Sequence, residues 1–230
     1  MQTPDQLIDR LIELAFAEDV GDGDATTLST IPADAMGRQH LLIKQEGILA
    51  GVDIARRVFE FFDPSLKMTV FIEDGAHVKP GDIAFVVEGP VRSLLQTERV
   101  MLNIMQRMSG IATMTAKYQE RLAGLHTKVL DTRKTTPGMR ILEKMAVKIG
   151  GGANHRIGLF DMILIKDNHT DFAGGIAQAV ARAKEWNRAN GKDLRIEQEV
   201  RNTDEINEAL EAGVDRIMLD NFTPERTAEA

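Results

Sequence analysis

The sequence predicts an α/β protein in two parts, and three observations support this prediction. Beyond residue 110, short apolar runs that end in polar residues alternate with helical stretches, which is typical of a parallel sheet or barrel. Before residue 110, strand and helix signals occur without this regular alternation, as in an α+β domain. Apolar residues make up 43% of the 230 residues, enough for a globular core. We therefore expect domains at 1–110 and 111–230.

The N-terminal part shows both helical and strand periodicity. The apolar spacing predicts helices over 4–16 and 52–62 and strands over 39–44 and 68–72. The segment 73–88 resembles half of a biotinyl or lipoyl carrier, but Lys79 lacks the flanking motif of a carrier lysine, so we expect two structural strands. The acidic segment 18–27 lacks EF-hand spacing and is interpreted as a Gly/Asp turn.

A long helix over 91–122, with a break near Ser109 and Gly110, is expected to link the two parts. The elements that follow it alternate in type. Strands are expected at 129–130, 162–165, 196–199 and 217–219, and helices near 138–149, 172–190 and 203–212.

Composition excludes several classes of protein. A net charge of −7 argues against general nucleic-acid binding, and no apolar run approaches the roughly 18 residues of a membrane span. The N-terminus lacks the basic and apolar regions of a secretory signal, so we expect a cytoplasmic protein. The absence of cysteine excludes disulfides, thiolate catalysis and cysteine metal sites. Residues 130–169 are nevertheless locally basic, which suits a small anionic ligand.

The predicted strand ends carry charged side chains. In an α/β barrel the active site lies at the carboxyl ends of the strands, so we expect these side chains around one mouth. A surface ion pair is the better explanation for any one of these side chains. Charged side chains at all four predicted strand ends, however, favour a functional site. The residues are Thr132, Arg133 and Lys134 after the first strand, then Lys166, Glu199 and Asp220.

Two further segments hold candidate anion donors. The glycines at 150–152 can bring backbone N–H groups close to an anion, although a helix C-cap and turn also explains them. His155 and Arg156 follow as possible carboxylate donors. Arg99 lies in the long helix among apolar neighbours, so we expect it to be buried and to need a partner.

These motifs, in this order and spacing, resemble the quinolinate phosphoribosyltransferases, also called carboxylating nicotinate-nucleotide pyrophosphorylases, of the type II phosphoribosyltransferase family. The resemblance covers nearly the whole chain and is specific as a combination. The matching runs are 18–21 with 23–27, 97–99 with 106–113, 131–138, 150–156, 164–169 and 219–222.

The resemblance implies an N-terminal α/β sandwich and a C-terminal incomplete, TIM-like α/β barrel. It implies a homodimer, or a higher oligomer built from it, in which the sandwich of one subunit closes the barrel mouth of the other. Arg99 would then reach the neighbour's site. The family continues beyond the motif at 219–222 with its last barrel strands and its 5′-phosphate loops. We therefore expect this chain to be a fragment or a natural truncation that binds quinolinate better than phosphoribosyl pyrophosphate and turns over poorly or not at all.

The resemblance also implies an activity: phosphoribosyl transfer to quinolinate with decarboxylation, giving nicotinate mononucleotide, CO2 and pyrophosphate in NAD biosynthesis. The enzyme would be a pentosyltransferase. Its quinolinate-binding residues would be Arg99, Arg133, His155, Arg156 and Lys166, with Thr132 in the same substrate loop. Lys134, Glu199 and Asp220 would act on the phosphoribosyl donor, the two carboxylates holding its Mg²⁺ directly or through water.

One residue departs from the family pattern, because Gln198 stands where the strand usually has an apolar residue between two glutamates. By alternation we expect Gln198 to face the helix layer.

Three alternatives stay open. A related protein encoded in molybdate-transport operons shares much of the pattern, though the run at 150–156 fits the quinolinate enzymes better. A Schiff-base lyase could use Lys134 or Lys166 at a strand end. A non-enzymatic carrier could be built on the lipoyl-like segment 73–88.

Overall fold

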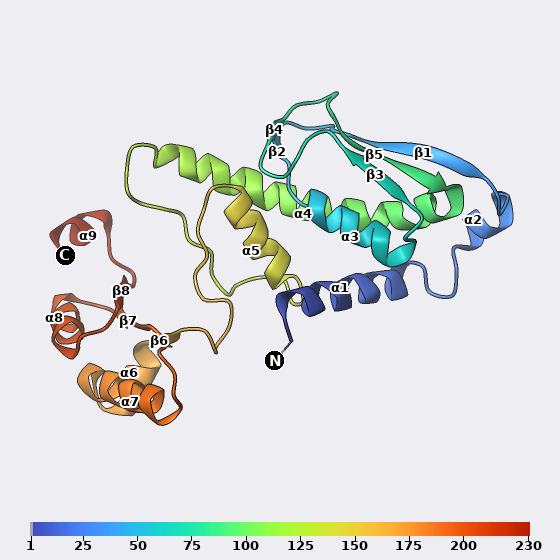
Figure 1. Cartoon of the computed structure of the whole chain (residues 1–230). Helices are drawn as coiled ribbons and strands as arrows, with labels where there is room; N and C mark the ends of the chain where they lie inside the picture. Colours follow the sequence, from blue (N-terminus) through green and yellow to red (C-terminus); the bar gives the residue numbers. More distant parts are fainter. Residues whose placement is uncertain (1) are drawn as a thin grey trace. The chain divides into compact units, whose positions relative to one another are not determined.

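The computed structural model describes residues 2–230, and their packing separates the chain into two units, Met1–His155 and Arg156–Ala230. These packing units divide after residue 110, since a long helix, α4 (Val91–Arg121), passes through that position without a break, and the domain boundary at residue 110 stays a prediction. Figure 1 shows this helix continuing from the blue-to-green part of the chain toward the segment that carries α5 (Arg140–Ile149).

The first unit contains a three-stranded antiparallel sheet in the order β1-β5-β3. These strands are β1 (Met36–Leu42), β3 (Lys67–Val70) and β5 (Ile83–Pro90). A separate antiparallel pair joins β2 (Gly47–Ile48) to β4 (His77–Val78). The segment 73–88 therefore forms strands of a structural β layer, as the sequence analysis predicts.

Helices pack beside this sheet and build the core of the first unit. Figure 1 shows α3 (Val52–Phe62) and α4 running along the sheet. Buried apolar residues of α3 and α4 meet those of β5, with the rings of Phe59 and Phe85 6.2 Å apart in an edge-on arrangement. A sheet with one face covered by helices is an α/β sandwich, which confirms the predicted class of this part.

The N-terminal segment contains two capped helices. The first, α1 (Pro4–Asp19), begins with a capping box in which Thr3 and Gln6 bond to each other's backbone N–H groups. The second, α2 (Ala25–Thr30), begins at Asp24, whose carboxylate accepts the N–H groups of Thr26 and Thr27 at 3.0 Å. The Gly/Asp turn predicted at 18–27 thus leads into a short helix that periodicity did not reveal, because six residues hold too few turns to show a pattern.

The predicted break near Ser109 and Gly110 is wrong. The hydroxyl of Ser109 donates to the carbonyl oxygen of Ala50 at 3.1 Å and accepts the N–H of Ala50 at 3.0 Å. These bonds fasten the middle of α4 to the chain between β2 and α3. Gly110 is exposed and helical, so the cost of a glycine at this position does not interrupt the helix.

The second unit is a parallel three-stranded sheet in the order β6-β7-β8. Its strands are β6 (Ile163–Ile165), β7 (Ile196–Val200) and β8 (Arg216–Leu219). The helices are α6 (Asp167–Ala173), α7 (Ile176–Ala189), α8 (Thr203–Ala212) and α9 (Pro224–Glu229). The parallel α/β arrangement confirms the predicted class, and the barrel itself stays a prediction.

The helix predicted near 172–190 corresponds to α7, except that its first two residues are the end of α6. Gly174 and Gly175 separate α6 from α7 with φ angles of 89° and 127°. Residues with a Cβ rarely adopt such angles, whereas glycine does so readily, so the pair ends one helix and starts the next in a new direction.

The strand predicted at 129–130 is present only as an isolated parallel bridge between Leu130 and Ala153. Among residues 2–230, no helix has the length and apolar content needed to cross a membrane.

Candidate active site

The loop after Leu130 carries the first group of predicted site residues. The hydroxyl of Thr132 accepts the backbone N–H of Lys134 at 3.0 Å, which turns the chain at this point. Arg133 is half-buried, and Lys134 is exposed. The loop therefore holds two cations in succession, one of them open to solvent.

The helix α5 holds this loop in place. The Arg140 guanidinium donates to the Thr135 hydroxyl at 3.1 Å and to the Arg133 carbonyl oxygen at 3.2 Å. One carboxylate oxygen of Glu143 accepts the Thr136 N–H at 3.3 Å, and the other accepts two N–H groups of Arg107, the shorter at 2.7 Å. Burial alone would raise the pKa of Glu143, but the hydrogen bonds from Arg107 and Thr136 outweigh it and hold that pKa below its usual range.

The glycine run after α5 is a helix end rather than an anion cradle. The N–H groups of Gly150, Gly151 and Gly152 donate to carbonyl oxygens of α5 residues at 2.9–3.0 Å. A Cβ at Gly150 would come within 2.3 Å of the Ala112 carbonyl oxygen, so glycine is required there for α5 to end against α4. Of the two interpretations offered by the sequence, the C-cap and turn is correct, because the amides are already bonded within the chain.

A buried ion pair, which no sequence motif indicates, joins the loop after Leu130 to the segment after the glycine run. Lys144 of α5 contacts the carboxylate of Asp131, and both side chains are almost fully buried. The Lys144 ammonium also donates to the carbonyl oxygen of His155 at 3.0 Å, and the N–H of His155 donates to Asp131 at 2.8 Å. The only available sequence signal was the position of Lys144 within the apolar face of the predicted helix 138–149.

His155 and Arg156 stand at the junction of the two units. The backbone of His155 is held by Asp131 and Lys144, as described. Arg156 begins the second unit, is half-buried, and donates to the carbonyl oxygen of Met162 at 3.4 Å. The carboxylate of Asp161 accepts the N–H groups of Ile157 and Gly158, each at 2.8 Å, and so closes the turn after Arg156.

In the second unit, the predicted residues of three strands lie at one edge of the sheet. Lys166 follows β6, Glu199 lies near the end of β7, and Asp220 follows β8. The Lys166 ammonium and the Glu199 carboxylate are 3.5 Å apart. The N–H of Asp220 donates to the carbonyl oxygen of Val200 at 2.9 Å, which extends the β7–β8 pairing to the edge where these charges gather.

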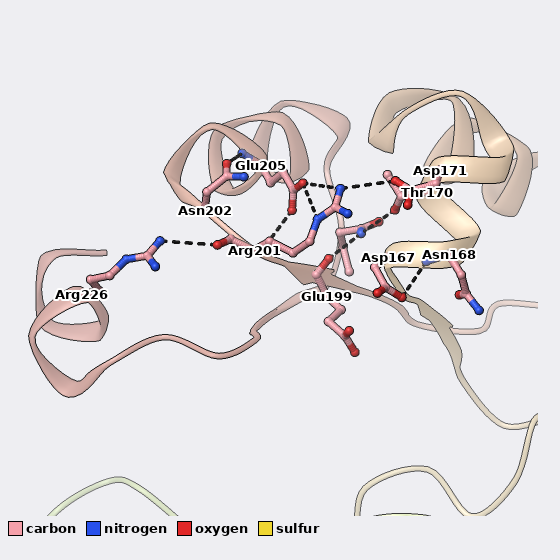
Figure 2. Close-up of polar contacts among 10 residues, drawn as sticks. Asp167, Asn168, Thr170, Asp171, Glu199, Arg201, Asn202, Glu205 and Arg226 are labelled. Carbon is pink, nitrogen blue, oxygen red and sulfur yellow. Dashed lines mark hydrogen bonds and ion pairs between the residues drawn. The ribbon is translucent and has the colours of Figure 1, made fainter.

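A second ionic cluster lies beside this edge. Figure 2 shows the guanidinium of Arg201 between Glu205 of α8 and Asp171 of α6, while the Glu199 carboxylate points away from this cluster. Arg201 donates to Glu205 at 2.7 Å and approaches Asp171 at 3.4 Å. The cluster joins α6 and α8 and leaves Glu199 to face Lys166.

Gln198 faces the helix layer, as predicted by alternation. Its amide is fully buried and donates to the hydroxyl of Thr170 in α6 at 3.0 Å. The amide nitrogen of this polar residue is therefore satisfied, while its buried side-chain oxygen has no hydrogen-bond partner among residues 2–230.

The burial expected for Arg99 is wrong. Arg99 is exposed, because the apolar side of α4 that packs into the core carries Leu94 and Val100 instead. An exposed arginine needs no partner within its own chain, so the structure leaves Arg99 available on the surface of the first unit.

The carboxyl ends of β7 and β8 could hold a metal ion only if a bound substrate supplied further oxygen ligands. Among residues 2–230, no group of three or more histidine, aspartate or glutamate side chains is arranged to hold a metal ion. Glu199 and Asp220 provide carboxylates at the same edge, as β7 and β8 are neighbours. Mg²⁺ is commonly held by one or two carboxylates together with phosphate oxygens of a substrate, and these two residues suit that arrangement.

Comparison with protein-family models matches both parts of the chain. Residues 24–109 match the model described as "Quinolinate phosphoribosyl transferase, N-terminal domain", and residues 111–230 match the model of the C-terminal domain. The two matches meet at residue 110, where the sequence analysis placed its domain boundary, although the packing units divide after His155.

Curated proteins of similar sequence carry corresponding names. The chain is 45% identical over 219 residues to a decarboxylating quinolinate phosphoribosyltransferase of Nicotiana tabacum, matching 92% of this chain and 62% of that protein. It is 42% identical over 216 residues to a probable carboxylating nicotinate-nucleotide pyrophosphorylase of Bacillus subtilis, matching 94% of this chain and 73% of that protein. The chain thus spans a little under two thirds of the length of the plant relative.

Solved structures agree in fold. The NadC structure from Streptococcus pyogenes superposes with a TM-score of 0.91 at 41% identity, covering 100% of this chain and 80% of that one. The nicotinate-nucleotide pyrophosphorylase from Francisella tularensis gives a TM-score of 0.89 at 42% identity, covering 97% and 78%.

Proposed function

The chain belongs to the quinolinate phosphoribosyl transferase family, and from this we propose that its parent activity is phosphoribosyl transfer to quinolinate with loss of CO2, a step of NAD biosynthesis. The observation that carries the proposal is the basic loop Thr132–Lys134, which α5 holds in place within a chain of net charge −7. Such a loop suits a small ligand with several negative charges.

We assign quinolinate to the cations of the two loops. Quinolinate is a planar dicarboxylate, and a guanidinium can donate to a carboxylate through two N–H groups at once. Arg133, His155 and Arg156 would bind the carboxylates together with Lys166, and Thr132 would shape the loop. Arg99 would complete the site from a second subunit.

The phosphoribosyl donor is assigned to Lys134, Glu199 and Asp220. As pyrophosphate leaves, positive charge develops at C1 of the ribose and negative charge on the leaving oxygens. Lys134 is exposed at the loop tip and would stabilise the leaving group, while the two carboxylates would hold ribose hydroxyls or the waters of Mg²⁺. When bound, Mg²⁺ offsets negative charge on the pyrophosphate.

Decarboxylation requires no protein nucleophile. Transfer to the ring nitrogen makes that nitrogen positive, and a positive nitrogen stabilises the carbanion that forms as the adjacent carboxylate leaves as CO2. A proton from water then replaces the lost carboxylate on that ring carbon. The role left to the protein is to hold the ring so that the second carboxylate stays bound. Arginines placed around a dicarboxylate fulfil that role.

We further propose a cytoplasmic homodimer whose sites are shared between subunits. The exposed position of Arg99 supports this, since a side chain on the surface can reach a neighbour. Arg99→Ala and Lys134→Ala should each abolish nearly all activity. Mixing the two inactive proteins under subunit exchange should restore activity, because some mixed dimers contain one intact site. No recovery would contradict a shared site.

The test of the activity uses quinolinate labelled at its 2-carboxylate. Any labelled CO2 that the protein releases with phosphoribosyl pyrophosphate and Mg²⁺ should disappear when the donor is omitted. Calorimetry with quinolinate alone gives an independent measure of binding. The proposal is wrong if the protein neither binds quinolinate nor releases CO2 above the control without donor.

A further inference from the structure

The buried ion pair of Asp131 and Lys144 has no part in the proposed chemistry, although it adjoins Arg133 and His155, which are assigned to quinolinate. Lys144 is 2% exposed, and its ammonium contacts Asp131 and the carbonyl oxygen of His155. Lys144 belongs to α5, Asp131 to the loop with Arg133, and His155 to the end of the glycine run. The pair therefore connects three separate segments of the first unit.

Asp131 completes the connection with both of its carboxylate oxygens. One oxygen accepts the N–H of His155 at 2.8 Å in addition to the Lys144 ammonium. In the amide orientation that satisfies its hydrogen bonds, Asn154 donates to the other oxygen at 2.8 Å and to the Lys144 carbonyl oxygen at 2.9 Å. The two charges are thus enclosed by donors and acceptors from both loops.

A buried ion pair whose atoms are all hydrogen-bonded fixes the positions of the segments it joins more than it adds stability. Removing two charges from water costs free energy that their attraction only partly returns, and an apolar contact could join a helix to a loop without this cost. Hydrogen bonds, unlike apolar contacts, define direction and distance. The bonds formed by Asp131 determine where the backbone of His155 lies relative to the loop that begins one residue after Asp131.

We propose that Asp131 and Lys144 are positioning residues that hold the Thr132–Lys134 loop and His155 at the separation that a planar dicarboxylate requires. This proposal rests on the proposed function, since the dicarboxylate is the ligand assigned there. Neither residue contacts the ligand. Both act through the backbone that carries Arg133 and His155.

The test compares Lys144→Met with Lys148→Met. Both substitutions replace a lysine of α5 by the same apolar residue, but Lys148 lies one turn further along and is exposed. In Lys144→Met, amide hydrogen exchange should accelerate in segments 131–136 and 150–155, and the affinity for quinolinate should fall by about tenfold or more. Lys148→Met should match the unmodified protein in both measurements.

Two further variants separate positioning from loss of folding. Lys144→Arg keeps the charge and should restore part of the affinity lost in Lys144→Met. If Lys144→Met unfolds, the double variant Asp131→Asn with Lys144→Met removes both charges and should fold, with the same fast exchange in the two loops and the same weak binding. Wild-type loop exchange and wild-type affinity in a folded variant that lacks the ion pair would overturn the proposal.

The outcome is distinguishable from failure of the proposed function. If the unmodified protein does not bind quinolinate, the function fails, while hydrogen exchange still decides whether the ion pair holds the loops. If the protein binds quinolinate and loop exchange is unchanged in Lys144→Met, the positioning proposal fails and the function stands.

Discussion

The two units hold their candidate site residues by different means. In the first unit the loop 131–136 and His155 are held by an ion pair that is almost fully buried and bonded on all sides. In the second unit the two ion pairs near the candidate site each have a cation open to solvent, since Lys166 and Arg201 are more than two fifths exposed beside Glu199 and Glu205. Buried charges are costly to separate, whereas exposed pairs contribute little, so the same kind of substitution should have unequal effects in the two units.

The largest effect on stability is expected from Asp131→Ala. This substitution leaves the Lys144 ammonium buried without its carboxylate, which costs about 3–5 kcal/mol. Thermal or urea unfolding measures the change, with Asp193→Ala, an exposed aspartate of the second unit, as the matched control. A loss no greater than that of the control would remove the contrast between the units.

Arg133→Ala should mainly weaken quinolinate binding. A charge-assisted hydrogen bond contributes roughly 1.5–3 kcal/mol, which corresponds to about a 10- to 150-fold loss of affinity. The fold should persist, because the bonds to α5 come from the backbone carbonyl of Arg133 and from Asp131. Titration calorimetry with quinolinate checks the affinity, and unchanged binding would remove Arg133 from the site.

The ion pair of Glu143 with Arg107, together with the hydrogen bond from Thr136, should make the first unit sensitive to acid. The folded-state pKa of Glu143 is lowered, so its stabilising effect is complete above its ordinary value of 4.5 and is lost as pH falls through the folded pKa. Glu143→Gln should cost about 1–2 kcal/mol at pH 7, and this difference should shrink below about pH 4. Unfolding measured across this range tests the sign, and a difference that grows in acid would contradict it.

The smallest effect is expected from Arg201→Ala. Arg201 is exposed, and solvent screens its attraction to Glu205 and Asp171. The melting temperature should hardly change, in contrast to Asp131→Ala. A loss comparable to that of Asp131→Ala would mean that the cluster between α6 and α8 is as important as the buried pair.

The spacing of apolar residues located most of the helices and strands, because it reflects which side of each segment is buried. Helices α3 and α8 have the predicted bounds, and the strands that end at Ile165 and Leu219 lie where apolar runs meet charged residues. One error occurred where a distant segment decides the outcome, and another where turn residues within the segment were overlooked. The predicted break in α4 is absent because Ser109 bonds to Ala50, and α7 is separate because two glycines turn the chain.

The motifs indicated candidate site residues but not the residues that hold them in place. Arg133, Lys166 and Glu199 were identified by type and by position at strand ends, which depend only on local order along the chain. Their roles, and those of the other site residues, stay predictions. Lys144 was missed because a lysine within an apolar helical face has no sequence signature that distinguishes burial from exposure.

The sequence by itself determined the alternation of elements, the family motifs and the family to which they point, since each is written in residues close together along the chain. Only the tertiary structure showed that Asp131 and Lys144 pair beneath two loops, that Arg99 is exposed, and that the glycine run ends a helix. The physical reason is the same in each case. Burial and hydrogen bonding depend on which segments meet in space, and those segments are separated along the chain.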